Sequence, residues 1–187
     1  MYLGLDLSLT GTGLCLIHPD YSIESTSLIH NVASDDVTRL FLNQTDLEAF
    51  LNSIKEQVTL CCIEGPAFSV RDGGHLFQIG EWTGVAKLVL YNLNIPFIIA
   101  APLQLKKYIS GTGKNVRKEL IMLDIYKKYG EELRDNNIAD AYVLSRIARD
   151  YDYVSTAKSD CEDLFKYQKE VIDVLIKSNK ESNKKII

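Results

Sequence analysis

Two short apolar runs, each associated with one acidic residue, limit most strongly how this chain can fold. Asp6 lies within Tyr2–Leu7, and Glu64 directly follows Thr59–Ile63. Continuous apolar runs of this length are typical of strands buried on both faces of a sheet. A carboxylate in such a strand is unfavourable unless it is paired or binds a metal ion. If the two strands are neighbours, both carboxylates can converge on one point.

The remaining pattern predicts an α/β domain with a mixed sheet and helices on both of its faces. The five expected strands are Met1–Leu7, Gly11–Ile17, Ser22–Ile29, Thr59–Ile63 and Ile95–Ala100, the first three forming an antiparallel meander. Apolar residues at helical spacing predict helices over Asp35–Glu56, Leu76–Leu93, Leu103–Ile109, Asn115–Tyr129 and Asn136–Asp150. The first of these is either one helix or two, broken near Asn43.

Length and composition indicate one soluble globular domain with an appended tail. The chain has 187 residues, of which 46% are hydrophobic, and no apolar run is long enough to span a membrane. We expect a domain over residues 1–154 and a C-terminal helix with a polar tail over 155–187, in a cytoplasmic protein. Five residues at helical spacing predict that this helix docks on the core, rather than contacting DNA or a second copy: Leu164, Gln168, Val171, Ile172 and Leu175.

The cysteines are predicted to be structural thiols. Cys15, Cys61 and Cys62 lie inside apolar strand-like runs, and the sequence contains no CxxC pair. A zinc site or a disulfide framework would require ligand spacing or an oxidising context that this pattern does not indicate.

A third acid, Asp140, begins an otherwise apolar helix. Asn137 lies three residues before it, so both side chains project from one helical face. Each acid alone has an ordinary explanation, because a strand acid can be a satisfied structural group and Asp140 can interact with the helix N-terminus. The four oxygen donors together favour a site for Mg²⁺ or Mn²⁺ over one for zinc.

Four segments, in this order, resemble motifs of the RuvC-type Holliday-junction resolvases. Leu3–Gly13 resembles the first strand and turn of that family, and Cys62–Phe68 resembles its Ile-Glu segment. His75–Leu90 resembles the helix that follows, and Asn137–Ala141 resembles the closing acidic helix. The resemblance covers roughly residues 1–150, at sparse identity.

The resemblance implies an RNase H-like fold, with a mixed five-stranded sheet, helices on both faces and here an extra C-terminal helix. It also implies two-metal hydrolysis of DNA, which leaves a 5′-phosphate and a 3′-hydroxyl. Asp6 would bridge both ions, and Glu64 and Asp140 would each hold one side. Asn137 is the fourth candidate ligand.

Two positions depart from the family pattern. Leu7 stands where the family usually has Pro, and Asn137 stands where it has Asp or sometimes His. An amide oxygen still ligates a hard cation but brings no charge, so metal affinity should fall. Asp135 is expected before the helix and on another face. Asn137 is compatible with a natural ligand or with an inactivating change, because Asp→Asn is isosteric.

The DNA contacts implied by the resemblance lie in two places. In the loop Gly65–Gly74, Phe68 is expected to stack on an unpaired base, with Arg71 beside it. Lys127 and Lys128 are explained by a solvated helix face. The densest basic stretch is expected to bind phosphates through Lys106, Lys107, Lys114, Arg117 and Lys118.

The expected partners are branched DNA, above all four-way junctions, and a second copy of the chain. A four-way junction has two-fold symmetry, so paired nicks require two sites related by that symmetry. Following the family, the interface is expected on the helix Leu76–Leu93, through Trp82 and the small residues Gly80, Gly84 and Ala86.

Three alternatives remain open. Asn137 is compatible with a junction-binding protein without catalysis, and the fold class also includes YqgF-like RNA-processing nucleases. Gly4–Gly13 also resembles the phosphate-binding hairpin of actin/Hsp70-like ATPases. Those proteins enclose nucleotide between two such domains, and this chain has the length of one, so we expect neither a nucleotide cofactor nor a membrane partner.

Overall fold

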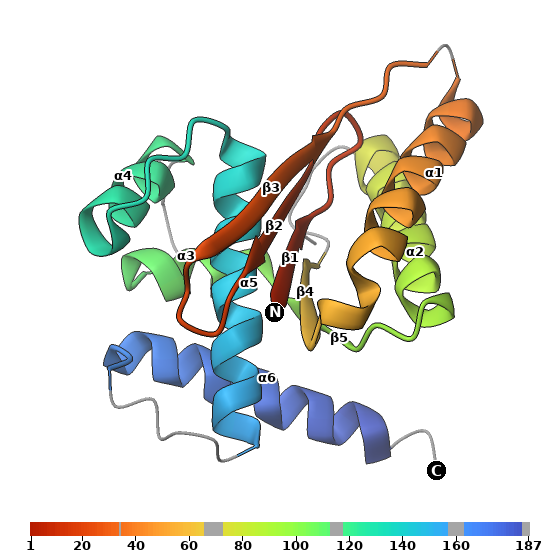
Figure 1. The fold of residues 1–187 in the computed structure, drawn as a ribbon. Coiled ribbons are helices and arrows are strands. Elements are labelled where there is room, and N and C mark those ends of the chain that lie inside the picture. The colour runs from red at the N-terminus through yellow and green to blue at the C-terminus, as the bar shows by residue number, and fades with distance from the viewer. Residues whose placement is uncertain (34, 66–72, 113–117, 157–162, 185–187) are drawn as a thin grey trace.

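The protein is described by a computed structural model that covers residues 1–33, 35–65, 73–112, 118–156 and 163–184 (Figure 1). Five strands form one mixed sheet in the order β3-β2-β1-β4-β5. Strands β1 to β3 pair antiparallel, whereas β1–β4 and β4–β5 pair parallel. The predicted mixed sheet and its antiparallel meander are therefore confirmed. The strands are β1 (Tyr2–Asp6), β2 (Thr12–Ile17), β3 (Ile23–Ile29), β4 (Leu60–Glu64) and β5 (Phe97–Ala100).

Six α-helices are present in the described residues, two on one face of the sheet and four on the other (Figure 1). Helix α1 is continuous and ends in a short 3₁₀ turn, η1, so the alternative of two broken helices is wrong. The helices are α1 (Asp36–Ile54), η1 (Lys55–Gln57), α2 (Gly73–Asn92), α3 (Pro102–Ser110), α4 (Lys118–Tyr129), α5 (Asn136–Ser155) and α6 (Lys166–Lys184).

Each face of the sheet has its own core, because successive strand residues point to opposite faces. Leu3 and Leu5 of β1 pack with buried residues of α1 and α2. Tyr2 of β1 and Cys62 of β4 pack on the other face, with α3 to α6. Each core is thus closed by helices from different parts of the chain.

Helix α5 crosses the sheet at very short range, and two glycines permit this. A Cβ on Gly4 would overlap the backbone of Ala141, and a Cβ on Gly13 would overlap the backbone of Asn137. Any side chain at either position would push the N-terminal half of α5 off the sheet.

The C-terminal helix docks on the core, as its pattern predicts. Val171, Ile172 and Leu175 of α6 join the core that includes α3 and α5, and Leu164 and Gln168 are also buried. The division of the chain at residues 154 and 155 stays a prediction.

The cysteines of the described residues are fully buried free thiols. Burial raises the pKa of Cys15 to about 12 and raises the pKa values of Cys61 and Cys62 as well. These thiols therefore stay protonated and act as small apolar core groups. None of the described helices is long and apolar enough to cross a membrane.

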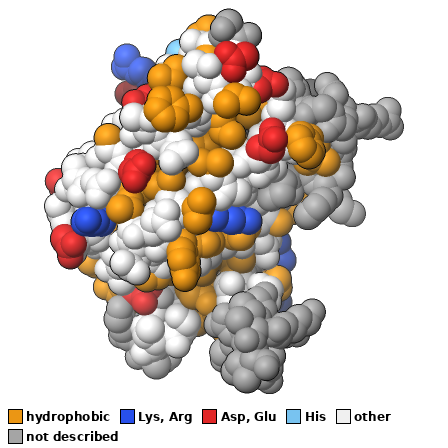
Figure 2. Space-filling model, turned by 90° about the vertical axis from the view of Figure 1, so that its right-hand side faces the viewer, with side chains coloured by type: hydrophobic (Ala, Val, Ile, Leu, Met, Phe, Trp, Pro, Cys, Tyr) orange, Lys and Arg blue, Asp and Glu red, His pale blue; other side chains and the backbone are white. Residues whose placement is uncertain are grey.

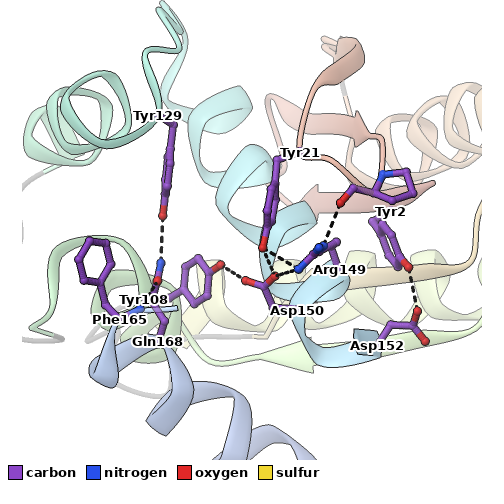
Figure 3. A network of polar contacts seen from close by, with 10 residues as sticks. Tyr2, Tyr21, Tyr108, Tyr129, Arg149, Asp150, Asp152, Phe165 and Gln168 are labelled. Carbon is purple, nitrogen blue, oxygen red and sulfur yellow. Dashed lines mark hydrogen bonds and ion pairs between the residues drawn. The ribbon is translucent and has the colours of Figure 1, made fainter. Parts of the chain in front are cut away.

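A buried carboxylate ties α5 to two distant parts of the chain (Figure 3). Asp150 is inaccessible to solvent, accepts a 2.6 Å hydrogen bond from Tyr21 and another from Tyr108, and pairs with Arg149 at 3.0 Å. A buried carboxylate is tolerated when its oxygens are satisfied in this way. The network fixes α5 against the β2–β3 turn and α3.

Candidate active site

Asp6 and Glu64 end two neighbouring parallel strands. The register pairs Leu5 of β1 with Ile63 of β4, so the next residue along each strand is one of the two acids. Glu64 shares its face with Cys62, and Asp6 shares its face with Gly4, because side chains alternate. Both carboxylates therefore lie on the α5 face, at the carboxyl edge of the two strands.

The N-terminal part of α5 brings Asp140 to this edge. Asp6 is paired in register with Gly13, whose Cα lies against the backbone of Asn137. Gly4 lies against Ala141, the residue after Asp140. Asp6 and Asp140 are only 5% and 7% exposed, and Glu64 is half-buried. Two buried acids and one half-buried acid thus line one corner between β1, β4 and α5.

Asn137 lies at the same corner, and Asp135 has a different role. Asp135 is the N-cap of α5, and its carboxylate accepts hydrogen bonds from the backbone N–H groups of Asn137 at 2.8 Å and Ile138 at 3.0 Å. The amide nitrogen of Asn137 is close to Gly11, where a Cβ would lie 2.9 Å from it. The expectation that Asp135 precedes the helix is therefore confirmed.

The helix terminus contributes to the electrostatics of this corner. The N-terminal end of a helix carries partial positive charge, which favours anionic groups close to it. Asp140 lies about one turn into α5, and Gly13, the register partner of Asp6, lies against the backbone of Asn137. The N-terminal end of α5 therefore adds partial positive charge beside the acids gathered here.

The donor set fits a hard divalent cation in its chemistry. Carboxylate and amide oxygens are the ligands of Mg²⁺ and Mn²⁺. In the part of the chain that is described, however, no three His, Cys, Asp or Glu side chains are close enough together to hold a metal ion. Cation binding would therefore require these carboxylates to draw closer than they are here.

Comparison with known proteins gives no sequence match and a clear structural one. No family model matches the chain, and no curated protein does. Thermus thermophilus RuvC superposes with a TM-score of 0.65 at 16% identity, covering 83% of this chain and 95% of that one. The same protein in complex with a Holliday junction substrate gives 0.66 at 15% identity, covering 83% and 94%. The yeast mitochondrial Holliday junction resolvase Ydc2 gives 0.50 at 15% identity, covering 76% and 75%.

This chain has the RuvC fold. The expected RNase H-like architecture, with its mixed five-stranded sheet, is confirmed over most of the chain. At identities of 15–16% the likeness establishes the fold, and the site residues have to be argued from their positions in this chain.

Only part of the expected DNA-binding set lies in the described residues of this RuvC fold. Lys106 and Lys107 are half-buried on α3, and the Lys107 ammonium forms an ion pair with Glu170 of α6 at 2.7 Å. For Lys118, at the start of α4, only the backbone is described. Phe68, Arg71, Lys114 and Arg117 lie outside the described residues, so their predicted roles stay predictions.

The predicted interface on α2 needs correction. Trp82 and Ala86 are fully buried in the core of their own chain, and the Trp82 indole donates a 2.9 Å hydrogen bond to Thr12. Helix α2 is apolar on two sides, so its small and aromatic residues did not show which side faces outward. The outward side carries Gly80 and Gly84 together with three exposed apolar residues, Phe77 (68%), Leu88 (58%) and Tyr91 (75%).

Hydrophobic side chains gather on the surface formed by α1 and α2. Figure 2 views the side on which α1 and α2 lie and shows orange patches between polar groups. A hollow of about 470 Å³ between the two helices is lined by Leu9, Val37, Leu40 and Phe77, among others. Exposed apolar groups of this extent are typical of association surfaces.

One lysine was assigned wrongly from the sequence. Lys127 is exposed as expected, but Lys128 is half-buried and donates hydrogen bonds to the Ile109 carbonyl and, at 3.0 Å, to the Tyr167 hydroxyl. Phe165 and Tyr167, whose rings stack on each other near this lysine, had no predicted role. The two aromatic residues immediately around the start of α6 were the available signal.

Proposed function

We propose that this chain is a metal-dependent, structure-selective endonuclease that resolves four-way DNA junctions by paired, symmetric nicks. The observation that carries the proposal is that Asp6 and Glu64 end adjacent parallel strands on the face covered by α5, and that the N-terminal part of α5, which carries Asp140, lies close against β1 and β2. Acids gathered in one buried place from distant parts of a chain are typical of functional sites. In a metal-dependent nuclease, Asp6, Glu64 and Asp140 would all serve as metal ligands.

The RuvC fold supports the substrate assignment. One of the matching structures is RuvC in complex with a Holliday junction substrate, and another is a mitochondrial Holliday junction resolvase. A fold alone does not determine function, so the proposal also depends on the acids of this chain.

Asp6, Glu64, Asp140 and Asn137 would hold Mg²⁺ or Mn²⁺ at this corner. When bound, such ions activate a water nucleophile and stabilise the leaving 3′-oxygen of the scissile phosphodiester. The carboxylates balance the charge of the cations, and the sheet and α5 fix the positions from which they do so. The phosphodiester P–O3′ bond breaks, water adds its oxygen to phosphorus, and the products carry a 5′-phosphate and a 3′-hydroxyl.

Two active sites are required for paired nicks, so we propose a homodimer. A two-fold axis through the junction must coincide with one through the protein. The outward side of α2, with Phe77, Leu88 and Tyr91, is the apolar surface best placed to be buried between two copies.

Cleavage of an immobile four-way junction with Mg²⁺ or Mn²⁺, with products mapped at nucleotide resolution, tests the proposal. We expect two nicks at symmetric positions on opposing strands, and ends that a ligase rejoins. Duplex DNA of the same sequence should stay intact. Preference for structured RNA would instead indicate an RNA-processing nuclease, and nucleotide-dependent thermal stabilisation would indicate an ATPase-like domain.

A second candidate function is junction binding without catalysis. Two observations favour it: Asn137 is neutral where an acid would strengthen the site, and no three acidic side chains of the described residues are gathered closely enough for a metal. Tight junction binding together with no cleavage in Mn²⁺ would establish this alternative.

A further inference from the structure

The first turn of α6 contacts the ends of two helices that lie far before it in the sequence. Lys128, near the end of α4, donates a hydrogen bond to the carbonyl of Ile109 near the end of α3. Its ammonium also lies 5.1 Å from the ring centroid of Tyr167 and 5.9 Å from that of Phe165. A cation this close to two aromatic rings is attracted by both. Lys128 therefore joins α3, α4 and the start of α6.

A second set of contacts connects the start of α6 to the end of α4. The Phe165 and Tyr167 rings are stacked, with centroids 5.4 Å apart and planes 6° from parallel. Gln168 is buried, accepts a hydrogen bond from the backbone N–H of Phe165 at 3.1 Å and donates one to the Tyr129 hydroxyl at 2.9 Å (Figure 3). The last residue of α4 is thereby tied to the first turn of α6.

A third set of contacts holds α3. Gly111, the C-cap of α3, has a φ of 80° and lies beside the Tyr167 ring, which a Cβ there would meet at 3.5 Å. Lys107, one turn earlier, forms its ion pair with Glu170. The carboxyl end of α3 is thus covered by Tyr167 and Glu170.

These contacts add little to burial. Phe165 is 52% exposed, and Lys107 and Glu170 are each more than a third exposed, so the contacts of these three side chains contribute weakly to stability, whereas Gln168 is buried. Burial of α6 comes mainly from Val171, Ile172 and Leu175, which lie further along the helix. The consequence of the first-turn contacts is therefore geometric: they fix the ends of α3 and α4 relative to each other.

We propose that the first turn of α6 is a positioning clamp for phosphate binding by α3 and α4. The clamp is formed by Phe165, which directly precedes α6, and by Tyr167, Gln168 and Glu170 near the start of the helix. The inference rests on the proposed function, because α3 carries Lys106 and Lys107 and α4 begins at Lys118. A helix pair held in one arrangement presents its cations to the DNA backbone without a further loss of conformational entropy on binding. The clamp residues act through the basic residues and do not need to touch DNA.

Binding of a four-way junction to Tyr167→Ala, in the full chain and without divalent metal, tests the clamp. We expect about three- to tenfold weaker binding and a salt slope smaller by about one, the effect of losing one phosphate contact. Tyr167→Phe loses the hydrogen bond from Lys128 but keeps the ring against Lys128 and Gly111, so it should restore most of both quantities. Val174→Ala, on the exposed side of the same helix, is the matched control and should change neither.

The salt slope separates positioning from a general loss of stability, because a folded but less stable protein keeps its number of phosphate contacts. If Tyr167→Ala does not fold, Phe165→Leu, at a half-exposed position, replaces it with the same expected direction. An unaltered chain that binds junctions, together with variants of unchanged affinity and slope, overturns the clamp alone. An unaltered chain that binds no junction overturns the proposed function and the clamp with it.

Discussion

Gly4 of β1 lies directly against Ala141 of α5, so close that a Cβ on Gly4 would overlap the Ala141 carbonyl. Ala141 follows Asp140, and Gly4 precedes Asp6 by two residues on the same face of the strand. The close contact between Gly4 and Ala141 therefore sets the distance between Asp140 on the helix and Asp6 on the strand.

Gly4→Ala should destabilise the fold and separate the two acids. Overpacking of this kind costs about 1–3 kcal/mol, measured as the free energy of unfolding in urea. Because α5 has to move away from β1, cleavage by the folded fraction should fall by about a hundredfold. Gly84→Ala on α2, where no atom lies within 4 Å of the new Cβ, is the control for the unfolding measurement only, because Gly84 lies on the proposed interface, and it should leave the fold intact or stabilise it slightly. Unchanged cleavage by Gly4→Ala would show that Asp140 is not part of the active site.

Asp6→Asn, Glu64→Gln and Asp140→Asn should each abolish junction cleavage and spare junction binding. Each change removes one negative charge from the corner without changing the shape of the side chain, so metal binding fails while the DNA-contacting surface remains. Gel-shift and cleavage assays on the same junction measure the two effects. Asp173→Asn, on the exposed side of α6, is the matched isosteric control. Near-normal turnover by any of the three variants would remove that residue from the site.

Asn137→Asp should shift the metal preference toward Mg²⁺. The neutral amide leaves the site one negative charge short, and Mn²⁺ binds such N and O sites more strongly than Mg²⁺ does. The unaltered chain should therefore cleave better in Mn²⁺, and the variant should gain most in Mg²⁺. Folding should hardly change, because a carboxylate is favoured near a helix N-terminus. A metal titration of the cleavage rate compares the two proteins, and equal Mg²⁺ dependence would show that position 137 is not a ligand.

Phe77→Glu and Leu88→Glu should convert the proposed dimer into monomers. A charge placed on the outward apolar side of α2 must be desolvated if two copies are to meet there. Loss of one buried apolar side chain alone is worth about 1.5–3 kcal/mol, which raises the dissociation constant about tenfold or more. Sedimentation measures the association. Val32→Glu, at another exposed apolar residue outside α2, is the control. A fully active monomer of the unaltered chain would contradict the dimer itself.

Lys106→Ala should weaken junction binding similarly for all sequences and reduce the salt slope by about one. Lys127→Ala, an exposed lysine on α4, is the control and should leave the slope unchanged. Binding is measured as a function of salt concentration on two junctions of different sequence. Weaker binding to one sequence only would indicate that Lys106 reads bases instead of phosphates.

The elements themselves were predictable because their information is local. Apolar runs and helical spacing located all five strands and all six helices of the described chain, with ends that differ by a few residues. Asp6, Glu64 and Asp140 could be recognised because a charge inside an apolar element stands out without any knowledge of its neighbours. The shared helical face of Asn137 and Asp140 also followed from sequence, since the helix period fixes which residues point together, whereas the shared face of Asp6 and Glu64 depended on the pairing of β1 with β4.

Positions that depend on how elements pack were not predictable. Trp82 was expected at an interface and is in the core, because α2 is apolar on two sides and only its contact with β2 decides which side turns inward. Lys128 was expected on a solvated face and is held between α3 and α6, because its partners Ile109 and Tyr167 are distant in sequence. The sequence by itself determined the elements and the three candidate acids, since these depend on local periodicity and on charge. Only the tertiary structure decided which side of each helix is buried and which residues from distant segments meet, since those depend on packing between segments that local pattern does not encode.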